Sequence, residues 1–353
     1  MGSWSHWHKS ERVSRMSKST CHIVVLIGLF LACASAFGAQ NANPFVGRWA
    51  LTIPGGGAGW LGVTQENGYL DASLLWGGGS VLPVDCVFVG DGDLYVVRLS
   101  KVERKDTAGK VVRTQTFPEI IRAELRDDAL QLTQITVRRD GSATEEREFT
   151  GKRIPPLPGK PDLSKVKFGP PIVLFDGKNL DAWKLTDPRA KSGWSIEDGV
   201  LVNKPVQPQG GRRVSFGNLR TVAEFEDFNL KLEVNVLKGE NSGVYLRGIY
   251  EVQVCDSYGR KLDSHNMGGI YSRITPTVNA EKPPGEWQTM DLTLVERHAT
   301  VVLNGQKIID NEPLLGCTGG ALWSDEFKPG PIYLQGDHTG VKYRNIVIAP
   351  VVK

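Results

Sequence analysis

Short stretches of alternating apolar and polar residues, each closed by a turn signal, make up most of this chain. A clear example lies within 230–236, where leucine and valine alternate with Lys231, Glu233 and Asn235. A period of two puts one apolar face on a core and one polar face toward solvent, as in a half-buried β-strand. No convincing helical stripe accompanies these strands. The pattern therefore predicts an all-β protein.

Turn signals arrange the expected strands into hairpins. Asp198 and the glycine after it lie at the centre of a hairpin expected over 194–202. Asn304 and its following glycine end a strand expected over 290–303. Asp-Gly and Asn-Gly pairs favour the tight turns of β-hairpins. Regularly punctuated strands of this length predict a large antiparallel sandwich.

Proline content divides the chain after its leader into two β-rich parts. Residues 44–153 form a smaller β-rich domain, 154–171 form a linker with six prolines, and 172–353 form the large domain. A segment so rich in proline is extended and cannot join a central strand. The first domain is expected to be a small barrel or sandwich. Its Gly-x-Trp49 opening and closing Arg153 resemble a lipocalin-type barrel.

The first 39 residues have the pattern of a signal peptide. Basic residues precede an apolar run over 23–37, and Ala34-Ser-Ala36 supplies small residues for cleavage. The run is short for a membrane-spanning helix. We therefore expect export to the periplasm or the outside of the cell. Cys33 stands in a weak lipoprotein box, and lipid anchoring ranks below soluble export.

Composition excludes several classes of protein. The chain has 353 residues, 40% of them hydrophobic, enough for a substantial core. Its net charge is +3, and its basic residues form no concentrated stripe. We therefore expect no nucleic-acid partner. After removal of the leader three cysteines remain, an odd number without close spacing. A Cys255–Cys317 disulfide is one alternative, and three small buried thiols, with Cys86 as the third, are favoured over it.

A polar strand face within 241–256 is the strongest candidate for chemistry. A glycine divides this stretch into two short runs, and alternation gives each run one apolar and one polar face. Asp256 has the wrong parity to join the polar face unless a β-bulge re-aims it. A solvated outer face is the competing interpretation. The residues expected on the polar face are Tyr245, Arg247, Glu251 and Gln253.

An ordered set of motifs over residues 171–350 resembles the 3-keto-disaccharide hydrolase domain family. The resemblance implies a concanavalin A-like jelly-roll sandwich and an exported enzyme that acts on 3-keto-glycosides. It also implies a partner oxidoreductase that makes the 3-keto sugar. The motifs are Leu174-Phe-Asp-Gly-Lys-Asn-Leu-Asp-Ala-Trp183, Trp194-x-x-Glu-Asp-Gly199, Thr221 with Glu226-Asp-Phe228, Asn241-Ser-Gly243, Tyr250-Glu-Val-Gln-Val-Cys-Asp256, Gly285-Glu-Trp287, Leu303-Asn-Gly305, Gly330-Pro-Ile-x-Leu-Gln335 and Tyr343-Arg-Asn-Ile346.

Cleavage of a 3-keto-glycoside would need a base near C2, a group that polarises the ketone, and an acid for the leaving oxygen. Glu251 is the expected base or acid, with Asp256 or His338 as its counterpart, and Arg247 would stabilise enolate charge. Asparagine, tyrosine, glutamine and tryptophan side chains would bind the sugar. The candidate catalytic residues are Glu251, Asp256, His338 and Arg247, and the candidate substrate-binding residues are Asn241, Tyr245, Gln253, Trp287 and Gln335.

Other interpretations of these residues stay open. An ordinary glycosidase would use Glu251 and Asp256 as its two carboxylates. A carbohydrate-binding module without catalysis would use the same fold. Glu251 and Arg247 could form a surface ion pair, His338 a turn, and Trp287 part of the core. No His or Cys pair has metal-ligand spacing, so no metal site is assigned, although a structural Ca²⁺ or other divalent ion held by loop oxygens would leave no pattern.

Overall fold

The computed structural model describes residues 43–54, 56–209, 212 and 214–352. Regular structure in this part of the chain is almost entirely antiparallel β-strand, as the alternation predicted. The exception is a short 3-10 helix, η1 (Leu163–Lys165), in the proline-rich stretch. A search of these residues finds no helix with the length and apolarity needed to cross a membrane. The predicted signal peptide over 1–39 lies outside the described residues.

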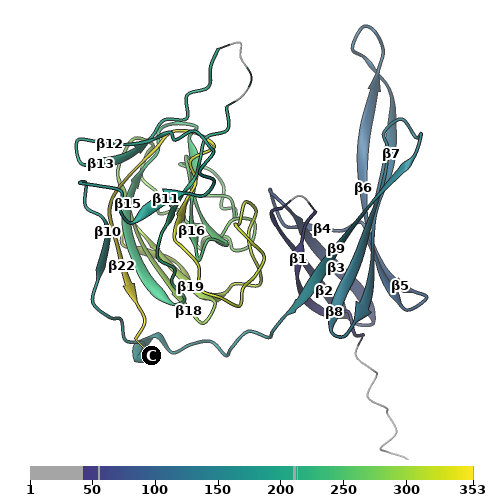
Figure 1. Ribbon diagram of the computed structural model, residues 1–353, viewed down its shortest axis with the longest axis horizontal. Helices are drawn as coiled ribbons and strands as arrows, with labels where there is room; N and C mark the ends of the chain where they lie inside the picture. The colour runs from purple at the N-terminus through teal and green to yellow at the C-terminus, as the bar shows by residue number, and fades with distance from the viewer. Residues whose placement is uncertain (1–42, 55, 210–211, 213, 353) are drawn as a thin grey trace, which may run out of the picture. The chain divides into compact units, whose positions relative to one another are not determined.

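The first sheet has nine strands, and neighbours in the chain are mostly neighbours in the sheet. Non-glycine residues with positive φ, such as Asn67, Asp91 and Asp127, make the turns between them. Figure 1 shows β6 and β7 continuing together as a long two-stranded hairpin. The order is β4 (Leu82–Pro83), β3 (Tyr69–Trp76), β2 (Ala58–Glu66), β1 (Gly47–Thr52), β9 (Thr144–Ile154), β8 (Ala129–Val137), β7 (Val111–Arg126), β6 (Asp93–Lys105) and β5 (Cys86–Gly90).

One apolar cluster fills the inner face of this sheet. It takes buried residues from strands across the sheet, among them Trp49, Leu94 and Leu132. The guanidinium of Arg153 lies 4.0 Å from the centre of the Trp49 ring. The same side chain donates hydrogen bonds to the backbone oxygens of Pro44 and Val46, at 2.7 and 3.0 Å. Arg153, near the end of the domain, thus contacts the ring and the backbone of residues at its start.

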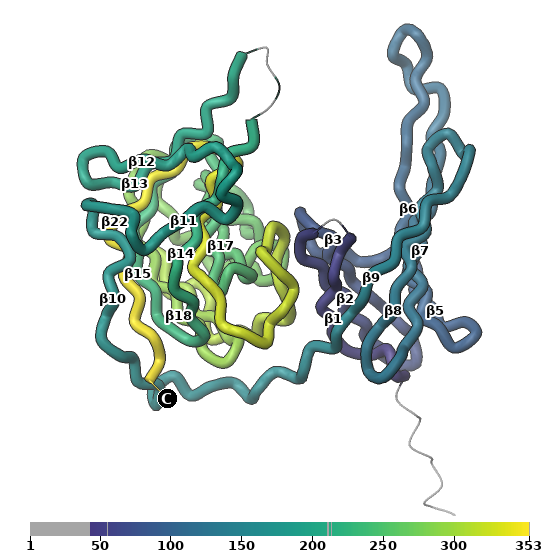
Figure 2. The backbone as a smooth tube through the Cα atoms, viewed as in Figure 1, coloured from purple at the N-terminus to yellow at the C-terminus, as the bar shows by residue number. Residues whose placement is uncertain are grey.

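Residues 172–350 contain two further sheets. The larger has eight strands, and β10 pairs with β22 beside its main path. Figure 2 traces how β10, near the start of this region, runs along β22 at its end. The strands are β12 (Trp194–Glu197), β13 (Val200–Asn203), β22 (Val341–Pro350), β15 (Phe228–Asn235), β18 (Gln288–Val295), β19 (His298–Leu303), β20 (Gln306–Pro313) and β10 (Ile172–Phe175).

The smaller sheet of this region has five strands and carries the stretch that the sequence singled out. Val244 and Val252 on this sheet, and Leu230 and Leu292 on the larger one, belong to one buried cluster. Two antiparallel sheets therefore enclose a common core, and the predicted all-β sandwich is confirmed. The strands are β11 (Trp183–Leu185), β14 (Leu219–Thr221), β21 (Tyr333–Leu334), β16 (Asn241–Leu246) and β17 (Tyr250–Cys255).

The hairpin predicted over 194–202 is confirmed, whereas the single strand predicted over 290–303 is wrong. β12 and β13 turn at Asp198, which has φ +49°. The chain also turns at Glu296 and Arg297, so that β18 and β19 form a second hairpin. Both turn residues have positive φ, at +48° and +60°. Neither is the glycine, asparagine or aspartate that usually marks such a turn, so no residue signal predicted it.

The cysteines follow the expectation only in part. Cys255 and Cys317 are separate buried thiols, so the alternative of a disulfide between them is not formed. Cys86 is exposed at the start of the edge strand β5, and the prediction that it is buried was wrong. β5 is the last strand of its sheet, and most of its residues are exposed.

Replacement of Glu296 by asparagine should stabilise the protein. A left-handed conformation costs a non-glycine residue on the order of 1 kcal/mol, and asparagine tolerates it best among residues with a side chain. We expect Glu296→Asn to raise the free energy of unfolding by up to about 1 kcal/mol. Urea unfolding measures this, with Glu286→Asn at an exposed position of ordinary φ as the matched control. Equal effects of both substitutions would contradict the assignment of strain to this turn.

Candidate active site

A cavity of about 310 Å³ lies on the face of the five-stranded sheet that points away from the sandwich core. Residues of β16 and β17 form its base, and residues after β21 form one side. Gly319 and Gly320 line it from the connection between β20 and β21, and Gly78 and Gly79 line it from the first β domain. Its volume is at the lower end of the range for small-molecule sites, about 300–1,000 Å³.

Glu251 is placed in this cavity by the register of the β16–β17 hairpin. Tyr245 stands opposite it, and both side chains point away from the core because Val244 and Val252 point into it. The hydroxyl of Tyr245 lies 2.8 Å from Oε2 of Glu251. Gly243 makes room for this carboxyl group, since a Cβ at that position would overlap it.

The Glu251 carboxyl is held in its neutral form at neutral pH. Its residue is only 4% exposed, and burial raises its pKa to about 8. The hydrogen bond from Tyr245 opposes this rise, and the negative charge of Asp337 adds to it. Burial also raises the pKa of the Tyr245 hydroxyl well above its ordinary value. Both groups therefore carry their protons before a ligand binds.

The proton positions around Tyr245 agree with a neutral Glu251. The Tyr245 oxygen lies 2.8 Å from the backbone oxygen of Gly319 and 2.8 Å from Glu251. A hydroxyl has one proton, and a backbone carbonyl can only accept a hydrogen bond. When Glu251 is protonated, Tyr245 can donate to Gly319 and accept from Glu251, and both bonds are satisfied. When Glu251 is ionised, one proton has to serve two acceptors.

A second carboxyl in the cavity, that of Asp337, is ionised at neutral pH. Asp337 accepts a hydrogen bond from Nδ1 of His338 at 2.8 Å. Burial alone would raise the pKa of the Asp337 carboxyl, but the hydrogen bond and charge of His338, with smaller contributions that include Asn218, hold it below its ordinary value. The site therefore combines a neutral glutamic acid with an ionised aspartate, and carboxyls separated in this way serve as acid and base.

Asn218 fixes the loop that carries Asp337. Its side-chain oxygen accepts hydrogen bonds from the backbone N–H groups of Gly336 and Asp337, at 2.7 and 3.0 Å. Its side-chain nitrogen donates to the hydroxyl of Tyr333 at 2.8 Å. The ring of Tyr333 stacks on Tyr245, with 4.2 Å between ring centres. One amide thus connects the ionised carboxyl to the aromatic pair beside Glu251.

Two amide oxygens in the cavity wall lack a hydrogen-bond partner. Within the described part of the chain, Oδ1 of Asn241 and Oε1 of Gln335 are buried and accept nothing. Buried polar atoms without a partner are rare and costly, and a ligand hydroxyl would satisfy them. The Tyr333 hydroxyl accepts a hydrogen bond from Asn218. Among the described residues it has no acceptor for its own proton. Asn241, Gln335 and Tyr333 therefore keep unused hydrogen-bonding capacity in the cavity wall.

Five of the nine predicted site residues line the cavity, and four do not. Trp287 immediately precedes β18 of the larger sheet, and the guanidinium of Arg344 covers its ring at 4.0 Å. Gln253 is buried, and its side-chain oxygen accepts from the backbone of Val254. The residues that line the cavity are Asn241, Tyr245, Glu251, Gln335 and His338.

The expectation that Arg247 and Asp256 meet Glu251 is not met. Arg247 has φ +55° at the hairpin turn, so strand alternation ends before it. Its guanidinium donates to the backbone oxygens of Glu326 and Lys328. Asp256 would need a β-bulge to join the polar face, but the β16–β17 register is regular. Its carboxylate instead accepts a hydrogen bond from the backbone N–H of Gly239 at 2.9 Å and so caps the turn there.

Asp337, Tyr333, Asn218 and Tyr271 line the cavity as well, and the sequence patterns predicted no catalytic role for any of them. A signal existed for Tyr333, which is two residues before Gln335 and so has the same parity as that predicted binding residue. Asp337 is adjacent to His338 in sequence, and its charge state depends on burial that no pattern shows. Asn218 and Tyr271 come from loops with no periodicity.

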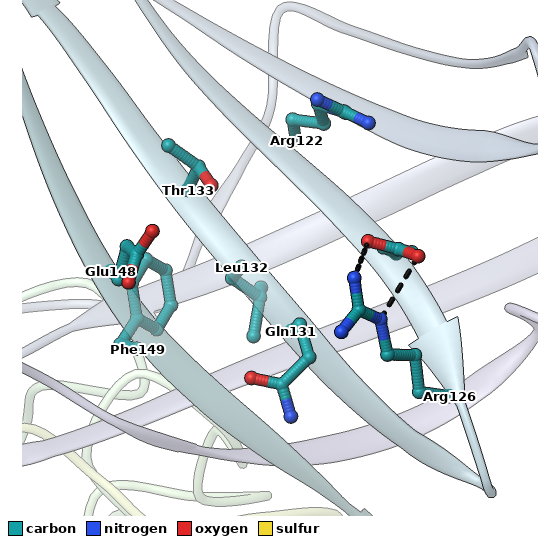
Figure 3. A pocket seen from close by; sticks show the side chains of 8 residues that line it. Arg122, Arg126, Gln131, Leu132, Thr133, Glu148 and Phe149 are labelled. Carbon is teal, nitrogen blue, oxygen red and sulfur yellow. Dashed lines mark hydrogen bonds and ion pairs between the residues drawn. The ribbon is translucent and has the colours of Figure 1, made fainter.

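A second hollow, of about 210 Å³, lies over β7, β8 and β9 of the first sheet (Figure 3). Three of its four charged side chains, Arg122, Glu124 and Arg126, are already paired. Arg126 binds both oxygens of Glu124, at 2.8 and 2.9 Å, and Arg122 binds Asp93 at 2.6 Å. Groups neutralised in this way offer a ligand little. Among the described residues, no group of three or more His, Cys, Asp or Glu side chains is arranged to hold a metal ion.

Individual proteins resemble parts of this chain. A 3-keto-disaccharide hydrolase of Bacteroides thetaiotaomicron is 26% identical over 162 residues, which cover 38% of this chain and 55% of that protein. The match thus spans about half the length of that curated relative. A candidate glycosyl hydrolase from Parabacteroides distasonis is 29% identical, with TM-score 0.41 over 60% of this chain and 96% of the other. Another from the same species is 21% identical, with TM-score 0.40 over 52% and 94%.

The family-level match is broader than these pairwise ones. Residues 170–349 match the 3-keto-alpha-glucoside-1,2-lyase-like domain, and the matched range is half of the 353-residue chain. It begins and ends within one residue of the range that carried the motifs, and it contains the five-stranded sheet and every cavity residue except Gly78 and Gly79. The resemblance drawn from the motifs is confirmed, and the chain belongs to the 3-keto-alpha-glucoside-1,2-lyase-like domain family.

Proposed function

We propose that this protein cleaves 3-keto-glycosides, including 3-keto-disaccharides, by elimination followed by hydration. The observation that carries the proposal is the pair of carboxyls in one sugar-sized cavity, with Glu251 neutral and Asp337 ionised. Membership of the family supports a glycoside-cleaving enzyme. The 3-keto sugar is proposed as the substrate because a ketone beside C2 would let the groups of this cavity cleave the glycosidic bond by proton abstraction.

A ketone at C3 acidifies the hydrogen on C2, so a modest base can remove it. His338, oriented by Asp337, is the proposed base that takes this proton. The electron pair forms an enolate, and its collapse breaks the bond between C1 and the leaving oxygen. Glu251 gives its proton to that oxygen. Water then adds across the new C1–C2 double bond, and the net result is hydrolysis.

The remaining cavity groups suit a sugar. The free oxygens of Asn241 and Gln335 would accept hydrogen bonds from ring hydroxyls. The Tyr333 hydroxyl would donate to the C3 oxygen, where negative charge develops. This assignment replaces Arg247, whose guanidinium is bound to backbone oxygens elsewhere.

An ordinary glycosidase is the second candidate, because a neutral and an ionised carboxyl are also its requirement. In that case Glu251 would be the acid and Asp337 the second carboxylate. The two candidates differ in whether the unoxidised sugar reacts. We further propose, from the leader pattern over 1–39, that the protein is exported and that a sugar 3-oxidoreductase supplies its substrate.

Glu251→Gln tests the role of the acid. Glutamine keeps the size of the side chain and a hydrogen bond to Tyr245, but it has no acidic proton. Loss of a general acid typically costs 10²–10⁴-fold, so we expect kcat on 3-keto-trehalose or a 3-keto-glucoside to fall at least about 100-fold. Release of the reducing sugar measures it, with trehalose in parallel. Turnover of trehalose alone would favour the ordinary glycosidase, and binding of both sugars without any turnover by the wild type would favour a carbohydrate-binding module.

Asp256→Asn separates this site from the one expected from the sequence. Asp256 contacts a backbone amide outside the cavity, so we expect kcat/KM on the 3-keto-glucoside to change less than about threefold. The same assay as for Glu251→Gln applies. A loss as large as that of Glu251→Gln would restore Asp256 as the catalytic partner and displace Asp337 and His338.

The raised pKa of Glu251 should make the free energy of unfolding depend on pH. This pKa in the folded protein is about 8, whereas a glutamate in an unfolded chain has a pKa of about 4.3. Between these values the folded protein keeps a proton that the unfolded chain has lost, so stability falls as pH rises. Urea unfolding at about pH 5 and about pH 8 should show a smaller fall for Glu251→Gln than for wild type. An identical fall in both proteins would mean that the Glu251 pKa is not raised.

A further inference from the structure

The cavity has a wall that the matched domain does not supply. Gly78 and Gly79, which lie between β3 and β4 of the first sheet, line the same cavity as Glu251. Residues 43–353 form one compact unit, so this contact lies within a single body. We propose that the loop 77–80, the selector loop, makes the first β domain a specificity element that confines the site to short glycosides. This inference rests on the proposed function and deepens it.

The selector loop is fixed at its C-terminal end by paired contacts. The backbone N–H of Val81 donates to Oγ of Ser272 at 2.8 Å, and the Ser272 hydroxyl lies 3.3 Å from the Val81 oxygen. Ser80 Oγ lies 2.9 Å from Nε2 of His265. The His265 ring meets Tyr271 edge to face, with 4.7 Å between ring centres, and Tyr271 lines the cavity. These contacts attach the loop to the cavity rim.

The other side of the loop contacts the segment that holds Tyr245. The N–H of Gly320 lies 3.4 Å from the Gly77 oxygen. Gly319 and Gly79 approach so closely that a Cβ at Gly319 would overlap the Gly79 backbone. The Gly319 oxygen in turn accepts from Tyr245, the partner of Glu251. The position of the selector loop is therefore coupled to the proposed acid through direct contacts.

The first sheet also packs into the sandwich core close to this loop. Ala58, Trp60 and Leu75 belong to the same buried cluster as the sandwich residues. The guanidinium of Arg273 lies 4.2 Å from the centre of the Trp60 ring. The loop is additionally held to its own sheet, since Gly77 N–H donates to the Ala58 oxygen at 2.9 Å. The selector loop is therefore held both by its own sheet and by the sandwich.

The glycines at 77–79 leave this part of the loop without side chains that could fill the cavity. A Cβ at position 78 would meet no atom within 4 Å, so this glycine borders open space. The cavity of about 310 Å³ suits a short glycoside better than a long polymer chain. A side chain at position 78 would occupy room that the sugar uses. Discrimination should therefore increase with the volume of that side chain.

The test is a series at position 78, with Gly78→Ala, Gly78→Leu and Gly78→Trp. Gly159→Trp in the linker is the matched control, because a Cβ there also meets open space and neither glycine has a positive φ. We expect Gly78→Trp to raise KM for a 3-keto-disaccharide at least about tenfold, with a smaller rise for methyl 3-keto-glucoside. We expect kcat to change less than about threefold and the thermal midpoint to match the control. Equal KM values for Gly78→Trp and Gly159→Trp would overturn the proposal.

A binding readout separates this proposal from the proposed function. Calorimetric titration with the 3-keto and unoxidised disaccharides, in a Glu251→Gln background, compares the Gly78 series without turnover. Weaker binding in Gly78→Trp than in Gly159→Trp supports the selector loop even if no glycoside is cleaved. Turnover by the wild type with identical binding across the series would leave the proposed function and reject the loop. Absence of binding to every probe would reject both.

Discussion

The pairing register of β16 and β17 is the constraint on which the candidate site depends. It sets Tyr245 against Glu251 on one face and Val244 against Val252 on the other. A slip of one residue would move every side chain to the opposite face. The carboxyl would then enter the sandwich core and the valines would enter the cavity. Burial of the two valines in the common core therefore secures the position of the proposed acid.

Hydrogen bonding and burial act in opposite directions on Glu251, and burial is the stronger. A hydrogen bond from Tyr245 to the ionised carboxylate would lower the pKa of Glu251, yet burial raises that pKa overall. Asp337, in the same cavity, is more open and has His338 as a hydrogen-bonding partner, and its pKa is lowered. Differences in solvation and partner thus give two similar groups opposite charges at one pH. The proposed mechanism uses this difference rather than any special property of either residue.

Strand patterning was a good guide for most residues inside regular elements, although Gln253 in β17 was predicted to bind substrate and does not line the cavity. The alternation around 230–236 and the Asp198 turn appear in the structure as expected, and the ordered motifs identified the family. Glu251, Tyr245 and Asn241 follow from the same alternation, and they line the cavity. Patterning failed at element ends. Arg247 is in a left-handed turn, so strand alternation does not place its side chain. The turn at Glu296 contains no glycine, asparagine or aspartate.

The rest of the cavity depends on contacts between distant segments, which a single sequence does not reveal. Asn218, Tyr271 and Gly319 come from loops, and their places follow from packing rather than from periodicity. The contribution of Gly78 crosses from one β domain to the other. The charge of Asp337 follows from its surroundings and not from its residue type. For such residues, three-dimensional proximity is the information that the chain order lacks.

Asn218 has a consequence for the way in which a ligand would be received. Its one amide group restrains the Gly336–Asp337 backbone and the Tyr333 hydroxyl at the same time. These polar groups are thus held in place before a sugar arrives, and little conformational freedom is left for binding to remove. An arriving ligand would displace solvent from a rigid template instead of organising a loose one. Recognition of this kind favours fast, selective capture over adaptation to many shapes.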